Sequence, residues 1–158
     1  MANTQSMCTS FLGELLTGTH NFGTAPVRAT GASDAFKGAL YLTSATLNAS
    51  TTVYSSTGEV TGSGYSPGGE AVTNATAPTT VNTSATAGTA YWTPSASLVF
   101  SSVTLTTAFD TVLIYNSTQS NKAVSVHTFG SQTITAGNFT LTMPSNTSST
   151  ALLRLATT

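Results

Sequence analysis

The clearest pattern in the chain is an alternation of apolar and hydroxyl-bearing residues in its second half. Val103 and Leu105, for example, are separated and flanked by serine and threonine. A strand with one buried face shows this period of two, because successive side chains point to opposite faces of a sheet. The pattern predicts strands over 98–105, 111–115, 123–129 and 139–143.

The run 111–115 differs because it is continuously apolar, which is typical of a central strand. We therefore expect Ile114 to lie in the core. Truncating it to alanine should lower the free energy of unfolding by roughly 2–5 kcal/mol, measured by chemical denaturation. Shorter strands are expected over 39–43, 51–55, 59–61, 70–73 and 151–155, with a turn over 116–121.

The beginning of the chain has helical spacing instead. Met7, Phe11 and Leu15 lie four residues apart and would form one apolar stripe on a helix over 4–17, which Gly18 would end. An isolated helix of this length is marginal in water, so it must pack on something. Two alternatives remain open at this point, packing on its own sheet and anchoring into a neighbouring subunit.

The chain is expected to form a single domain over 1–158. Its parts would be the helix over 4–17, a connector over 18–35 and an antiparallel β-sandwich or jelly-roll-like domain over 36–158. The tract 74–90 has almost no large apolar residue and is expected to be an exposed loop. The aromatic pair Tyr91 and Trp92 follows this tract. We expect the pair to be an anchor in the core or in an interface.

Composition excludes more classes of function than any motif does. Only 9 of the 158 residues are charged, the net charge is −1, and serine and threonine make up roughly a third of the chain. A protein that binds nucleic acid through its phosphates needs a basic patch, so nucleic acid is not an expected partner. No apolar run is long enough to span a membrane. Low charge favours association, so the composition indicates a subunit of an assembly.

Candidate chemistry is sparse. The two histidines, His20 and His127, have no second histidine, cysteine or carboxylate nearby at metal-ligand spacing. Five carboxylates lie far apart, and the pair that a hairpin could bring together is Glu59 and Glu70. The single cysteine, Cys8, is expected to be a buried thiol and cannot form an internal disulfide. We therefore predict no catalytic residue, no metal and no cofactor.

Two stretches carry a resemblance to a known class of proteins. The first is FKGALYLTSATLNASTTVYSSTGEVTGSGYSPGGEAVT, with a K-x-A-L-Y strand from Lys37 to Tyr41 and an E-V-x-G-x-G-Y turn from Glu59 to Tyr65. The second is FDTVLIYNSTQSNKAVSVHTFGSQTITAGNFTLTMPS, from Phe109 to Ser145. Together with the short helix at the start, they resemble small virion-associated proteins of tailed bacteriophages.

The resemblance implies a structural role in a virion and no enzymatic activity. The first expectation is a capsid decoration or cement protein on the outer surface of the head, with the major capsid protein and copies of itself as partners. The alternative is a tail- or fibre-associated protein that contacts the host surface, with a host glycan near Tyr91 and Trp92. The interface residues expected under these hypotheses are Met7, Phe11, Leu15, Tyr91 and Trp92. The chain begins without a secretory signal, so synthesis in the host cytoplasm is expected.

Overall fold

The fold is mainly β, with antiparallel sheets and one short helix, as the sequence predicted. The computed structural model describes residues 3–16, 18–22, 33–73, 77–84 and 87–156. The elements in chain order are β1 (Ser6–Met7), α1 (Thr9–Leu16), β2 (Phe36–Leu42), β3 (Glu70–Ala71), β4 (Thr79–Ser84), β5 (Ala87–Trp92), β6 (Leu98–Asn116), β7 (Lys122–Leu141) and β8 (Leu153–Ala156).

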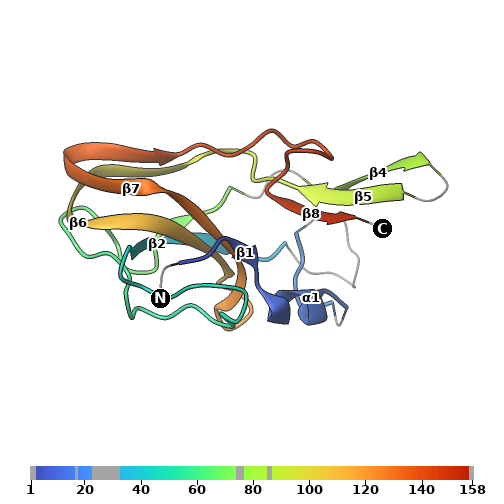
Figure 1. Ribbon diagram of the computed structural model, residues 1–158, viewed down its shortest axis with the longest axis horizontal. Coiled ribbons are helices and arrows are strands. Elements are labelled where there is room, and N and C mark those ends of the chain that lie inside the picture. Colours follow the sequence, from blue (N-terminus) through green and yellow to red (C-terminus); the bar gives the residue numbers. More distant parts are fainter. Residues whose placement is uncertain (1–2, 17, 23–32, 74–76, 85–86, 157–158) are drawn as a thin grey trace.

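The strands form two sheets. The larger sheet has five strands in the order β1-β7-β6-β2-β3, and the smaller has three in the order β4-β5-β8. In Figure 1 the larger sheet fills the left of the view, while the smaller sheet lies at the right with α1 below it. Much of the predicted connector, residues 23–32, lies outside the described residues.

One long hairpin, β6–β7, forms the centre of the larger sheet. The sequence predicted two separate strands within each arm, but 98–116 and 122–141 are continuous strands of 19 and 20 residues. The predicted turn between them is present, with Ser120 and Asn121 at φ 53° and 58°. The apolar alternation is interrupted near residues 106–110 and 130–138, where the register between β6 and β7 shifts.

The hairpin folds back on itself, which gives the protein its two layers. Phe109 pairs with Gln132 and Thr111 pairs with Thr128, so β7 uses four residues where β6 uses two. Extra residues on one strand bend an antiparallel pair locally. We call the part beyond this corner, Leu98–Leu105 with Ile134–Leu141, the upper limb, and the part next to the turn the lower limb. Figure 1 shows both strands reversing direction at the left of the view, a β-sandwich-like arrangement.

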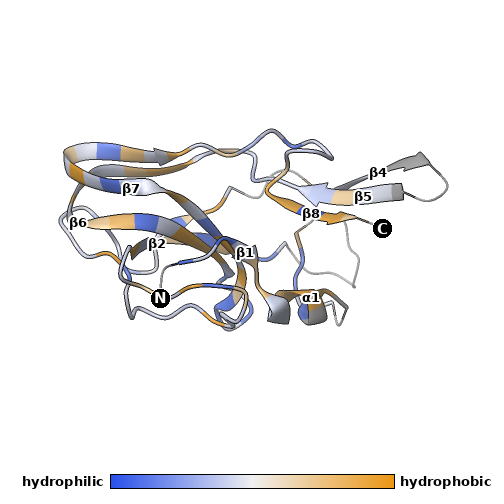
Figure 2. Cartoon of the chain, in the orientation of Figure 1, coloured by the Kyte–Doolittle hydropathy of each residue, from blue (hydrophilic) through white to orange (hydrophobic). Residues whose placement is uncertain are grey.

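The core lies between these layers. Ile114 is fully buried, as expected, together with Val112 and Leu113. Bands of hydrophobic and hydrophilic residues alternate along β7 in Figure 2, which is the period-two pattern seen in the sequence. Phe139 of the upper limb is only half-buried but packs against the core cluster.

The E-V-x-G-x-G-Y segment packs directly against the backbone of the upper limb. A Cβ on Gly62 would lie 2.0 Å from the carbonyl oxygen of Thr104, and one on Gly64 would lie 2.4 Å from that of Ser102. Gly64 also has φ 79°, which side-chain-bearing residues rarely adopt. The motif therefore has a structural explanation, since only glycine permits this approach.

Helix α1 begins later than the sequence predicted. The expected helix over 4–17 is Thr9–Leu16, because Ser6 and Met7 instead pair with β7 as a short strand. Its end is as predicted, with Gly18 at φ 65° donating its backbone N–H to the carbonyl of Leu15 at 3.0 Å. The helix packs on its own sheet, since Lys122 of β7 donates a hydrogen bond to Glu14 of α1. Cys8, directly before the helix, also donates its backbone N–H to the carbonyl of Val124 on β7.

The expected loop over 74–90 is wrong for most of its length. Residues 79–84 and 87–92 pair as the antiparallel hairpin β4–β5. Threonine and valine favour strands even where no large apolar residue is present, and β8 completes the sheet on the other side of β5. The predicted strands over 51–55 and 59–61 are reduced to isolated bridges from Val53 and Glu59.

Candidate functional site

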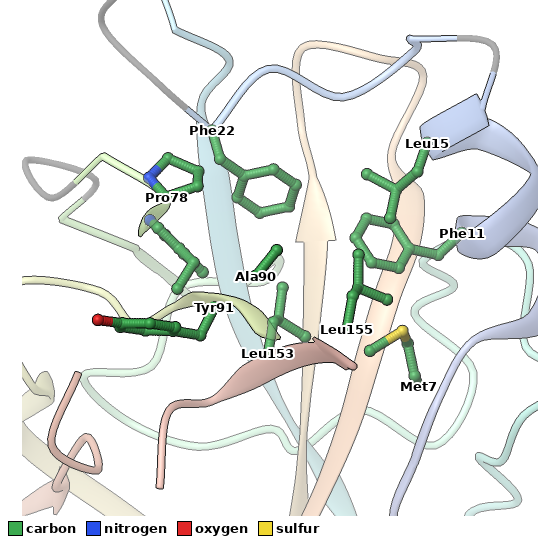
Figure 3. A pocket seen from close by; sticks show the side chains of 10 residues that line it. Met7, Phe11, Leu15, Phe22, Pro78, Ala90, Tyr91, Leu153 and Leu155 are labelled. Atoms are coloured by element: carbon green, nitrogen blue, oxygen red, sulfur yellow. The ribbon is translucent and has the colours of Figure 1, made fainter. Parts of the chain in front are cut away.

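An apolar groove lies between α1, the start of the chain and the smaller sheet. It contains all five residues expected in an interface, Met7, Phe11, Leu15, Tyr91 and Trp92. In Figure 3 Met7, Phe11 and Leu15 lie at the right of the space, and the ring of Tyr91 at the lower left points away from it. The structure thus brings together residues that are more than seventy positions apart in the sequence.

Four segments build the walls. Met7 comes from β1, and Phe11 and Leu15 come from α1 at helical spacing. The opposite wall comes from β5 and from Leu153 and Leu155 of β8, which lie two residues apart and therefore on one face of the strand. Phe22 and Pro78 close the upper side of the groove in Figure 3.

A cluster of aromatic rings packs around Phe22, which lines the groove. Phe22 stacks on Phe36 with ring centroids 4.4 Å apart, contacts Trp92 at 4.8 Å and meets Phe11 at 5.9 Å. Phe11 and Trp92 are each only 2% exposed, so both are mainly anchors of the chain's own core. A buried Trp92 does not offer its ring to a glycan, whereas Tyr91 on the opposite face of β5 is partly exposed.

The groove is suited to one apolar side chain. Its volume is about 130 Å³ and its lining is almost wholly apolar. Sites for drug-sized molecules usually enclose about 300–1,000 Å³ and place several polar groups to orient the ligand. This groove has neither property, so its geometry fits an anchor residue of a protein partner better than a small substrate.

A partly buried polar network holds α1 beside the groove. His20 Nε2 lies 2.7 Å from Glu14 Oε2, and Lys122 Nζ of β7 donates to Glu14 Oε1 at 2.5 Å. Burial raises the pKa of Glu14, but the hydrogen bonds from Lys122 and His20 outweigh it and leave the pKa below its ordinary value. The carboxylate therefore ties the helix to β7 as a charged group.

The network continues from His20 to the end of β6. The Asn116 amide nitrogen donates to His20 Nδ1 at 3.0 Å and to Asp34 Oδ2 at 2.7 Å. Because Nδ1 accepts from the Asn116 amide, Nε2 is the ring nitrogen that donates its proton to Glu14. His20 is thus a structural histidine that connects α1 with the sheet.

The two carboxylates considered as a catalytic pair do not face each other. Glu59 and Glu70 lie along the same edge of β2, opposite Tyr41 and Gly38 respectively. Glu59 is buried and accepts hydrogen bonds from Tyr54, Tyr65 and the Gly68 N–H, each at 2.7 Å. This carboxylate is committed to holding the loop over 54–69 against the sheet.

Burial and the Glu59 carboxylate also affect the tyrosines around it. Desolvation, followed by the hydrogen bond to Glu59, raises the pKa of both Tyr54 and Tyr65 well above the ordinary value. Desolvation and the Glu59 charge raise the pKa of Tyr115 to about 12. These phenols remain protonated donors at neutral pH, as a structural role requires.

The remaining histidine lies on β7. His127 Nε2 is 2.8 Å from Ser125 Oγ, and desolvation lowers the pKa of the imidazole to about 4. Within the described ranges, three or more histidine, cysteine or carboxylate side chains do not gather as a metal site would require. The single helix described there is also too short to span a membrane.

Sequence reasoning missed part of the groove. Phe22, Pro78, Leu153 and Leu155 line it, but each stands in a segment with no pattern that links it to α1. The alternation of Leu153 and Leu155 was the one available signal, since it marks one face of the last strand. Comparisons with protein-family models, curated proteins and solved structures give no match to this chain.

Proposed function

We propose that this protein is a structural subunit of a bacteriophage virion that decorates the assembled head. In this role it has no catalytic activity, and the groove receives an apolar side chain of the major capsid protein. Binding only to the assembled shell stabilises the shell by mass action. The resemblance to virion-associated proteins supplies the expected setting, and the groove supplies the means of attachment.

One observation carries the proposal, namely the open apolar groove on a chain with few charges. Leu155 lines the groove and is 42% exposed, so apolar surface remains in water until a partner covers it. Burying apolar surface is worth about 25 cal/mol per Å², which favours a partner that fills the space. An aliphatic or aromatic side chain would match both its volume and its chemistry.

Rebinding to stripped heads tests the proposal. Purified protein is added to heads from which the native copies have been removed, and bound protein is measured after sedimentation of the heads. The wild type should bind at saturable sites, and Leu155→Glu should reduce affinity at least tenfold, because the charge would be buried without a partner. The matched control is Val53→Glu, at an exposed valine outside the groove lining.

Two results would contradict the proposal. The first is that wild-type protein fails to bind heads, and the second is that Leu155→Glu binds as tightly as Val53→Glu. Both variants replace an exposed apolar residue with glutamate, so a difference between them reports on the groove and not on added charge. Their unfolding curves should match that of the wild type, which separates lost binding from lost folding.

A further inference from the structure

The outer edge of β7 is the longest open strand edge among the described residues. On this side β7 pairs only with β1, at Ser125 and Val126. From Thr128 to Leu141 no described strand covers it, although β6 pairs along its other side. An uncovered edge presents backbone N–H and C=O groups to any chain that can pair with them.

This edge lacks the usual protection against pairing. Proteins generally place charges or proline on exposed edge strands. No Asp, Glu, Lys, Arg, His or Pro occurs from residue 128 to residue 143, and the side chains of Ser131, Thr133 and Thr135 are exposed hydroxyls. One protective feature is present, a bulge at Ala136 with φ 48°, which interrupts the edge there.

We propose that Ser131–Thr135 of β7 pairs antiparallel with the same segment of a second copy about a two-fold axis at Thr133. The segment begins at the corner of the hairpin, where Gln132 pairs with Phe109, and ends one residue before the bulge at Ala136. In this register Thr133 faces Thr133 of the other copy, and Ser131 faces Thr135. The larger sheets of the two copies are then joined through their β7 strands.

A second copy fits this edge better than a charged partner does. A two-fold axis places each residue of the segment opposite a residue of the same segment, so an uncharged strand meets an uncharged strand without repulsion. Threonine pairs across antiparallel strands are favourable. A partner with charged residues would find no ionisable side chain for them on this stretch of edge.

This inference is independent of the proposed function, because self-pairing would occur in solution without any head. It also uses the edge of β7 beside the hairpin corner, whereas the groove lies at the smaller sheet and α1. Failure of either test therefore leaves the other proposal standing.

Analytical ultracentrifugation of the full chain tests the inference. The wild type should dimerise reversibly with rising concentration, and added salt should change this little because the paired segment is uncharged. Thr133→Lys should raise the dimer dissociation constant by about tenfold, since it places two lysines opposite each other. The matched control, Ser63→Lys, adds an exposed lysine on the opposite side of the upper limb, where Ser63 bridges to Thr104, and should dimerise as the wild type does.

Mixing two oppositely charged variants at Thr133 tests the register of the pairing. Thr133→Glu alone should be as weakly dimeric as Thr133→Lys, but an equimolar mixture of the two should form a heterodimer that salt weakens. Three results would overturn the inference. They are a wild type that stays monomeric at every concentration reached, a dimer that Thr133→Lys leaves intact, and a mixture that remains as dissociated as each variant alone.

Discussion

Phe109 and Phe139 meet edge to face across the fold-back of the β6–β7 hairpin, with ring centroids 5.1 Å apart and planes at 88°. Phe109 is fully buried at the corner, and Phe139 extends from the upper limb. Phe129 on the lower side of the corner completes the group, 5.3 Å from Phe139. This contact joins the two layers and holds the fold-back closed.

The first prediction concerns the coupling between these rings. Replacing either Phe109 or Phe139 with leucine keeps the site apolar but removes the aromatic pair. The double-mutant cycle should give a coupling free energy of about 0.5–1.5 kcal/mol, measured by urea unfolding. The single variant Phe109→Ala should cost roughly 3–5 kcal/mol, because it also leaves a cavity. A coupling near zero would show that the layers are not held together by this pair.

The second prediction concerns the buried Glu59 carboxylate. Glu59→Gln replaces one of the two accepting carboxylate oxygens with an amide nitrogen that can only donate, and it removes the charge from the bonds with Tyr54, Tyr65 and the Gly68 N–H. The free energy of unfolding should fall by about 2–3 kcal/mol, as expected for bonds to a charged group. Glu70→Gln is the control, since Glu70 is only half-buried, and it should change stability by less than about 0.5 kcal/mol. Equal effects of the two substitutions would contradict the structural role of Glu59.

The third prediction is a pH dependence that arises from His127. Its folded-state pKa is lowered from 6.5 to about 4, so between these values the unfolded chain binds more protons than the folded chain. Stability should therefore fall as the pH is lowered through this window, with a slope of up to about 1.4 kcal/mol per pH unit. Denaturant unfolding at several pH values measures the slope. His127→Gln should reduce it, and an unchanged slope in this variant would assign the effect to another group.

The sequence was informative where side-chain periodicity decides the structure. The alternation near Val103 and the apolar run at Ile114 predicted buried strands, and Gly18 correctly marked the helix end. These features depend on neighbours in the chain, so a local pattern captures them.

Other features depend on distant partners, and local patterns missed them. Met7 has helical spacing with Phe11, and Ser6 falls within the expected helix. Both residues instead form a short strand, because they pair with the edge of β7. The tract near 79–90 lacks large apolar residues, yet pairing with β8 makes it a sheet. The groove was recognised only in part, because Leu153 and Leu155 reach it from the far end of the chain.

A structural role on the head can be tested by counting the copies of this protein in each particle. Quantitative mass spectrometry of purified virions gives the ratio of this protein to the major capsid protein. Symmetric decoration requires many copies of this protein, in a simple ratio to the capsid subunits. A few copies per particle would contradict it and would place the protein in a tail or fibre, and its absence from virions would reject a structural role altogether.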